Sequence, residues 1–332
     1  MDWIEVIILL VKILVVAVAL LSGFAVMTWF ERRLIAGFQV RIGPNRVGPL
    51  GLLQPAADGL KLAMKEDLTP SQADRVVFVL APMVSMTAAL VAFSVVPFGP
   101  PDFRIFGRLV PLHIAADLSI GFLMLLAVAS LGIYGIVLAG WSSGSKYSLL
   151  GGLRSSAQMI SYELAMGLAL VSVLIAAGSV NTLEIASKPA LWLAQFPAFV
   201  IFFICMIAET NRAPFDLAEA EQELVAGFHT EYASFKFALF YMGEYVNMIT
   251  FSALAVVLFF GAWHGPFVDR FPLLGVVWFL AKIVVFMFVY VWIRATLPRI
   301  RYDRLMSLGW KVLLPASLLW VMITATWVTF VK

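Results

Sequence analysis

The chain has 332 residues, of which 62% are hydrophobic and only 13% are charged. Soluble domains are roughly half apolar and a quarter charged, so this composition excludes an ordinary soluble domain and favours a protein that lies in a bilayer. The net charge of +3 excludes a protein that coats nucleic acid, and the single cysteine, Cys205, excludes a disulfide framework and any zinc or iron–sulfur site held by this chain's cysteines alone.

Apolar runs recur along the whole chain. A helix needs roughly 20 apolar residues to cross the hydrocarbon of a bilayer. Runs of that kind lie at about 4–29, 76–98, 118–140, 158–178, 190–208, 236–260, 273–293 and 310–330. The sequence therefore predicts an all-α polytopic membrane protein with about eight transmembrane helices, in which residues 1–332 form a single integral membrane domain.

Basic residues are distributed unequally between the two faces of this arrangement. Sixteen of the 23 Lys and Arg residues lie in or beside the loops on one face, and five lie on the face that holds both termini. Because cytoplasmic loops carry the excess of Lys and Arg, we expect both termini on the outer, periplasmic side. The inner loops are then 30–75, 141–157, 209–235 and 294–309.

The inner loop 30–75 begins with three charged residues and continues through the turn-rich stretch RIGPNRVGPLG. After Pro55, apolar residues fall at helical spacing, and charged residues lie on the other faces: Ala56, Leu60, Ala63 and Met64 against Asp58, Lys61 and Lys65. This pattern predicts an amphipathic helix at the membrane interface. Two interpretations stay open, a surface anchor or the lining of an entry path for a lipid-like substrate.

The inner loop 209–235 is acidic. Pro214 suits a first helical position, and Asp216, Glu219 and Glu223 would then share one helical face. The loop carries six acids against the single Arg212: Glu209, Asp216, Glu219, Glu221, Glu223 and Glu231. A solvated acidic face would explain them. Carboxylates crowded in a low-dielectric site would instead hold protons near neutral pH and serve as a proton store or relay.

Three ionisable residues lie inside the expected spans, namely Glu163, Glu244 and Lys282. Charges at such depth are costly, so they normally face a water-filled interior and mark a proton or ion route. A structural ion pair is the other interpretation, with Lys282 neutralising a carboxylate on a neighbouring helix.

The last inner loop, 294–309, is basic. It holds Arg294, Arg299, Arg301 and Arg304 together with Asp303. Three interpretations fit this pattern: a topology signal, ion pairs with the acidic loop, or a docking site for an acidic soluble partner.

The sequence lacks the motifs of several other kinds of functional site. His113, His229 and His264 are far apart along the chain, which excludes a cytochrome of the di-haem b type and a zincin. We expect each of them to be an ordinary interfacial side chain. No P-loop and no dinucleotide fingerprint occurs, so we expect no metal, redox cofactor or nucleotide site in this chain.

Several segments together resemble a known family, the H subunit (mitochondrial subunit 1) of the proton-pumping NADH:quinone oxidoreductase, respiratory complex I. The resemblance covers essentially the whole chain, and RIGPNRVG and PFDLAEAEQELVAG are its most specific motifs. It also rests on GWSSGSKYSLLGGLRSSAQMISYE and WIRATLPRIRYD. Ser119 and Gly144 stand where the family leads us to expect Asn, which concerns local loop structure only.

The resemblance implies that this chain connects the two arms of an enzyme complex. Such a chain joins the peripheral and membrane arms, forms the quinone access tunnel, and couples quinone reduction to proton translocation through a carboxylate network. It would be part of an enzyme without holding a redox centre, since NADH, FMN and iron–sulfur clusters belong to partner subunits. The implied partners are peripheral quinone-site subunits, antiporter-like and small membrane subunits, quinone and membrane lipid, with no nucleic acid. The implied location is a bacterial inner membrane, or alternatively a mitochondrial one.

Site residues follow from matching positions. For the quinone tunnel and cavity the resemblance implies Glu31, Arg32, Asp58, Lys61, Glu66, Arg212, Arg294, Arg299 and Arg301. For the proton relay it implies the carboxylates Glu163, Glu209, Asp216, Glu219, Glu221, Glu223, Glu231 and Glu244, to which the depth of Lys282 in its span adds a further candidate. Two other functions stay open: the anchor component of a related hydrogenase or dehydrogenase, and a stand-alone transporter coupled through Glu163, Glu244 and Lys282.

Overall fold

The structure, a computed structural model, describes residues 3–101, 103–105, 108–188, 193–216, 225–268 and 270–331. Its α-helices are α1 (Trp3–Phe38), α2 (Gln54–Met64), α3 (Arg75–Phe93), α4 (Gly121–Ser142), α5 (Lys146–Ala177), α6 (Thr182–Ser187), α7 (Phe196–Glu209), α9 (Ser234–Phe259), α10 (Leu273–Thr296), α11 (Tyr302–Leu308) and α12 (Leu314–Val331). Short 3₁₀ turns, η1 and η2, lie at Pro49–Gly51 and Gly227–His229, and a π-helical turn, η3, at Gly309–Leu313 joins α11 to α12. The strands β1 (Arg104–Ile105) and β2 (Arg108–Leu109) pair antiparallel.

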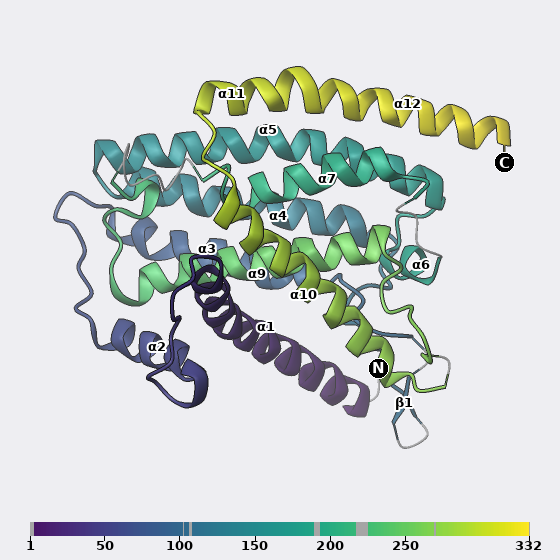
Figure 1. Ribbon diagram of the computed structural model, residues 1–332, viewed down its shortest axis with the longest axis horizontal. Coiled ribbons are helices and arrows are strands. Elements are labelled where there is room, and N and C mark those ends of the chain that lie inside the picture. The colour runs from purple at the N-terminus through teal and green to yellow at the C-terminus, as the bar shows by residue number, and fades with distance from the viewer. Residues whose placement is uncertain are drawn as a thin grey trace.

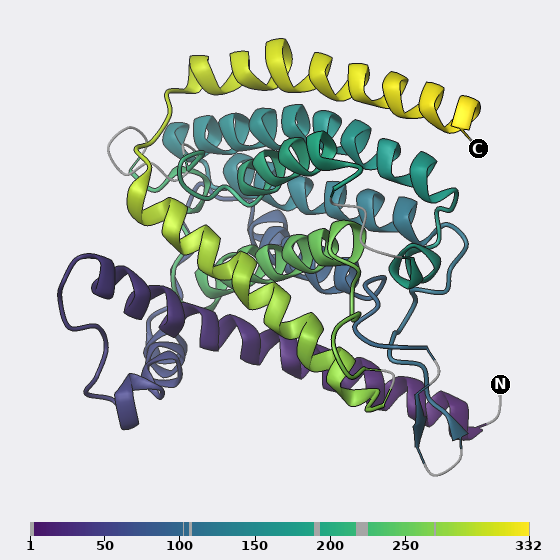
Figure 2. The same ribbon diagram turned by 45° about the vertical axis from the view of Figure 1, so that its right-hand side comes forward.

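The helices form a slanted bundle whose two ends differ (Figure 1). Both chain termini, α6 and the β1–β2 hairpin lie at one end, which we call the terminal end. The amphipathic α2 and the loop that precedes it lie at the other, the loop end, and the second view shows the same division (Figure 2).

Seven helices of the described residues are long and apolar enough to cross a membrane. This confirms the predicted helical membrane fold. The run predicted at 190–208 is the exception, because it forms the 14-residue α7, which begins only at Phe196. Gln195, just before α7, is buried and accepts hydrogen bonds from Ser172 Oγ and Trp320 Nε1, although Phe196, the first residue of the helix, is exposed.

The centre of the bundle is α9, which packs against α3, α10, α1 and α7. Small residues let the neighbouring helices approach closely, as is common between membrane helices. A Cβ at Gly135 of α4 would lie 2.8 Å from the backbone nitrogen of Ser85 in α3, and one at Gly151 of α5 would lie 2.6 Å from Gly227. The backbones at these two contacts therefore leave no room for a side chain.

Two predictions about the loop end have different outcomes. The amphipathic helix after Pro55 is present as α2, which buries none of its residues within the chain. The prediction that Pro214 begins a helix is wrong, because residues 213–216 form a turn. Phe215 N donates to Arg212 O at 2.9 Å, and Ile300 N donates to Pro214 O at 3.1 Å, so the turn is tied to the segment after α10.

Candidate functional site

Four helices bring charged side chains together inside the loop end of the bundle. Arg212, just after α7, lies between Glu31 of α1 and Glu244 of α9. Its Nη1 is 3.5 Å from Glu31 Oε1, and its Nε is 2.6 Å from Glu244 Oε1. Arg294 of α10 pairs with Glu31, and Tyr245 Oη donates to Glu31 Oε2 at 2.6 Å. We call these five residues the charged cluster.

The centre of the charged cluster is withdrawn from solvent, whereas Arg294 at its edge is 38% exposed. The side chains of Glu31 and Arg212 are only 5% and 8% exposed. Burial alone would lower the pKa of Arg212, but Glu244, Tyr245 and Glu31 hold it well above its ordinary value, so the guanidinium stays charged. The Arg212 guanidinium carbon also lies 4.3 Å from the ring centroid of Tyr245, a cation–π contact.

A second pair of carboxylates lies farther into the bundle. Glu209 ends α7 and is buried, and its Oε2 has no hydrogen-bond partner among the described residues. Glu163 of α5 accepts a hydrogen bond from Ser130 Oγ of α4, and its charge acts on Glu209. A buried carboxylate oxygen without a partner is costly, so Glu209 is suited to hold a proton or to bind a water molecule.

A small polar cavity of about 30 Å³ joins the two groups. Glu244 of the charged cluster and Glu209 both line it, together with Thr210, Asn211, His229, Tyr241 and Asn247. A cavity needs roughly 10–15 Å³ and two to four polar partners to hold a water molecule, and this one provides both. We call it the polar cavity.

Polar side chains of α5 fix the segment that carries Glu209 and Arg212. Gln158 Nε2 donates to the carbonyls of Ala208 and Phe215, at 2.8 and 2.9 Å. Asn211 Nδ2 donates to Ser155 Oγ at 3.1 Å. These buried bonds satisfy the Ala208 carbonyl in the last turn of α7 and the Phe215 carbonyl beyond it, so the turn after α7 is held in one place.

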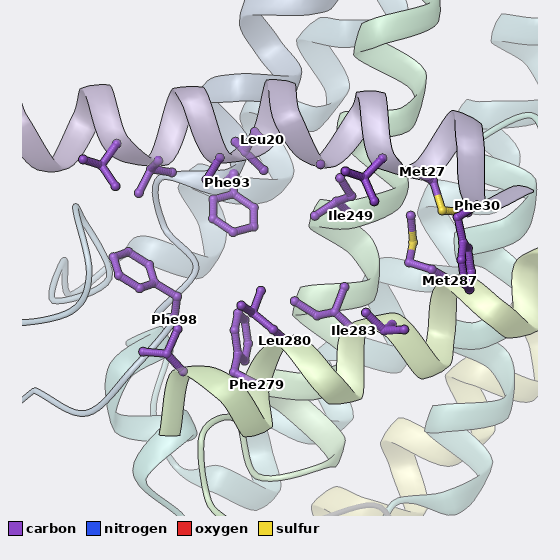
Figure 3. Close-up of a pocket in the computed structure, with 17 residues that line it drawn as sticks. Leu20, Met27, Phe30, Phe93, Phe98, Ile249, Phe279, Leu280, Ile283 and Met287 are labelled. Atoms are coloured by element: carbon purple, nitrogen blue, oxygen red, sulfur yellow. The ribbon is translucent and has the colours of Figure 1, made fainter. Parts of the chain in front are cut away.

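A larger, apolar cavity of about 410 Å³ lies between α1, α9 and α10 (Figure 3). Leu20, Met27 and Phe30 of α1 face Phe279, Leu280, Ile283 and Met287 of α10 across it, with Ile249 of α9 between them. Phe30 directly precedes Glu31, so the loop-side end of this apolar cavity lies next to the charged cluster.

A sequence profile of the NADH dehydrogenase family matches residues 11–325. The chain belongs to this family. It is 52% identical to the H subunit of the NADH-quinone oxidoreductase of Frankia casuarinae over 96% of this chain and 73% of that protein. It is 51% identical to the corresponding protein of Frankia alni over the same shares, and 49% identical to that of Paramagnetospirillum magneticum over 97% of this chain and 92% of the relative. These relatives confirm the resemblance to the H-subunit family.

Of the tunnel residues that the family resemblance implies, the structure brings Glu31, Arg212 and Arg294 together in the charged cluster. Arg32 and Asp58 form a separate ion pair at 2.6 Å that ties α1 to α2. Lys61 and Glu66 are exposed on α2 and just after it.

The arginines of the basic loop 294–309 make two kinds of contact, one with the acidic loop and one within the basic loop itself. Arg299 Nη2 is 3.1 Å from Asp216 Oδ2, which is the ion pair between the basic and acidic loops that the sequence left as one possibility. Arg301 is 82% exposed and pairs at 3.4 Å with its neighbour Asp303.

Of the relay candidates that the family resemblance implies, Glu209 and Glu244 line the polar cavity, and Glu163 interacts electrostatically with Glu209 without lining the cavity. Glu231 is half-buried in the loop before α9. Glu219, Glu221 and Glu223 lie outside the described residues.

Lys282 lies apart from these carboxylates. Its Nζ donates to the carbonyls of Phe260, Ala262 and His264 at 2.8, 3.0 and 2.8 Å. These are the contacts of a cap on the end of α9, and a role in the relay stays a prediction.

Sequence reasoning missed several polar partners within the spans. Gln158, Tyr245 and Ser130 are neutral, so a search for charged residues passes over them. Ser155 and Gln158 do lie at i and i+3 on one face of an apolar helix, and that spacing could have indicated a buried polar contact. Among the described residues, no group of three or more His, Cys, Asp and Glu side chains could hold a metal ion.

Proposed function

We propose that this chain is the membrane-embedded H subunit of a proton-translocating NADH:quinone oxidoreductase, in which it forms part of the quinone access tunnel and couples quinone reduction to proton movement. One observation carries the proposal: Arg212 contacts Glu31 beside the apolar cavity and Glu244 beside the polar cavity. A single buried cation thus links an apolar passage to a carboxylate route. NADH, flavin and iron–sulfur clusters would reside in partner subunits.

The apolar cavity supports the tunnel part of the proposal. Its volume of about 410 Å³ lies within the range of roughly 300–1,000 Å³ of small-molecule pockets. Its walls suit an isoprenoid chain, and the charged cluster at its loop-side end suits a polar head group in transit. In this proposal the exposed α2 and the basic residues of 294–309 belong to the face that docks the peripheral subunits, and Arg32 and Asp58 hold α2 against α1.

The charged cluster supports the coupling part. Uptake of electrons and protons by quinone near Glu31 changes the charge that Arg294 and Arg212 experience. Because Arg212 pairs with both carboxylates, a stronger attraction between Arg212 and Glu31 weakens the ion pair between Arg212 and Glu244. Glu244 can then exchange a proton through the polar cavity with Glu209 and onward to Glu163. Asp216, Glu219, Glu221, Glu223 and Glu231 would extend this route at the loop end.

The first experiment purifies the tagged chain in mild detergent and measures NADH:quinone reductase activity of the co-purifying assembly. The proposal expects activity together with antiporter-like and small membrane subunits. In the same assembly, Glu209→Gln should lower quinone-linked turnover, whereas Glu184→Gln, an exposed carboxylate at the terminal end, should leave it unchanged. A co-purifying hydrogenase, or a chain that is active alone, would support the other functions instead.

The proposed location is a bacterial inner membrane, with both termini on the outer side. The three relatives come from bacteria, and the excess of basic residues lies at the loop end. A C-terminal tag should then be accessible to an impermeant reagent added to whole spheroplasts but not to inverted vesicles.

A further inference from the structure

His229 lies at the wall of the polar cavity, where the sequence predicted an ordinary interfacial side chain. It ends η2 and lines the cavity together with Glu209 and Glu244. The imidazole packs edge-on against Phe228 and Phe237, with ring centroids 5.0 and 5.3 Å apart. The two phenyl rings hold the imidazole in one orientation at the cavity.

The exposure of His229 differs from that of the carboxylates it faces. Glu209 is buried, whereas His229 is half-buried. A proton that reaches Glu209 from the loop end has to cross the wall of the cavity. His229 has one side on the cavity and is partly accessible from outside, so it bridges the two environments.

Imidazole suits such a position because its two ring nitrogens can bind and release protons separately near neutral pH. Around His229, the titratable groups across the cavity are Glu209, Glu244 and Tyr241. Glu231 lies two residues away, and Lys236 is engaged by Asp67 at 3.0 Å. The other two histidines do not line the polar cavity: His113 lies 3.8 Å from Asp117, and His264 contacts Gly261 O at 3.0 Å.

We propose that His229 is the group through which protons exchange between the solution at the loop end and the carboxylates of the polar cavity. One ring nitrogen takes a proton from outside water while the other gives its proton, through a cavity water, to Glu209 or Glu244. No other bond is made or broken, and the return of the ring to its first tautomer resets the path. This inference rests on the proposed function of the carboxylate route.

The test compares His229→Gln with the matched control His264→Gln in the intact complex, reconstituted in proteoliposomes. His229→Gln should slow quinone-linked proton pumping at least about tenfold, since a positioned acid–base group is typically worth more than that. The pH profile of turnover should change shape, and added free imidazole should restore part of the rate. His264→Gln should match the unmodified complex in all three measurements. His229→Asn replaces His229→Gln if that variant does not assemble.

The outcomes separate this inference from the proposed function. If Glu209→Gln slows turnover while His229→Gln leaves the rate and the pH profile unchanged, the inference is overturned and the proposed function stands. A slower His229→Gln complex with an unchanged pH profile and no rescue by imidazole also overturns it, because the role of the ring is then structural. If Glu209→Gln and Glu244→Gln both retain full turnover, the carboxylate route and the inference fall together.

Discussion

Arg212 is the residue on which the charged cluster depends, because two carboxylates from different helices share it. Removing one member of a buried ion pair costs about 3–5 kcal/mol, since the remaining charge is left without compensation. Arg212→Met should therefore destabilise the chain by about that much, or prevent its assembly. Thermal unfolding of the purified complex, monitored through the amount of this chain that stays bound in it, measures the effect.

Two further variants make the Arg212 prediction specific. Adding Glu244→Gln to Arg212→Met removes one uncompensated charge and should recover part of the lost stability, which a double-mutant cycle quantifies. Arg301→Met, at a side chain that is 82% exposed, should leave the unfolding temperature unchanged. Equal losses in the single and double variants would contradict the shared-ion-pair explanation.

Lys282 provides a second residue-scale test, because its three hydrogen bonds all go to backbone carbonyls after α9. Lys282→Met would leave these carbonyls without that donor, at a cost of about 1–3 kcal/mol. If Lys282 acts only as this cap, stability is lower but turnover in each assembled complex is normal. Lower turnover at normal stability would instead support the predicted place of Lys282 in the proton relay.

At the scale of elements, the site depends on the close contact of α5 with η2. A Cβ at Gly151 would lie 2.6 Å from the backbone of Gly227, and η2 carries His229 into the polar cavity. Gly151→Ala should push the two backbones apart and lower both the yield of assembled complex and its turnover. Gly167→Ala on the same helix meets nothing within 4 Å and should be neutral or slightly stabilising, because Ala favours helix over Gly. Equal behaviour of the two variants in a thermal unfolding series would argue against this packing.

The sequence predicted elements better than contacts. Hydropathy is a local property, so the long spans and the amphipathic α2 could be predicted from runs of residues. Even there, no local pattern indicates that α7 begins only at Phe196, or that Gln195 before it binds Ser172 and Trp320. The sharing of Arg212 by Glu31 and Glu244 depends on how α1, α7 and α9 cross, and so it could not be deduced from spacing.

The contacts of Lys282 could not be predicted for the same reason, because they depend on how neighbouring helices pack. A lysine deep in a span indicates a functional or paired charge when only its depth is known. In the structure its partners are backbone carbonyls just after the neighbouring helix α9. For the acidic and basic loops, opposite charge alone made the Arg299–Asp216 pair one of three open interpretations.

At the scale of the whole molecule, the charged cluster lies beside both cavities. The apolar cavity extends along α1 and α10 toward the terminal end, whereas the polar cavity is lined by residues of α3, α4, α5, α7 and α9, of η2 and of the turn after α7. Only the first has walls that suit a long hydrocarbon chain. A change confined to the apolar cavity should therefore affect how the substrate's tail is bound and leave the carboxylate route intact.

Ala19 lines the apolar cavity, and Val18 beside it on α1 is 54% exposed on the outer face of the helix. Ala19→Phe should fill part of the cavity and raise the KM for a quinone with a long isoprenoid tail, while the KM for a short-tailed analogue stays nearly constant. Val18→Phe adds similar bulk outside the cavity and should change neither value. Steady-state kinetics of the reconstituted complex with both quinones measures the difference. An equal rise in KM for both quinones would mean that Ala19→Phe disturbs the charged cluster. A tail bound in this cavity has to compete with the added ring, so an unchanged KM for both quinones would mean that the tail takes another path.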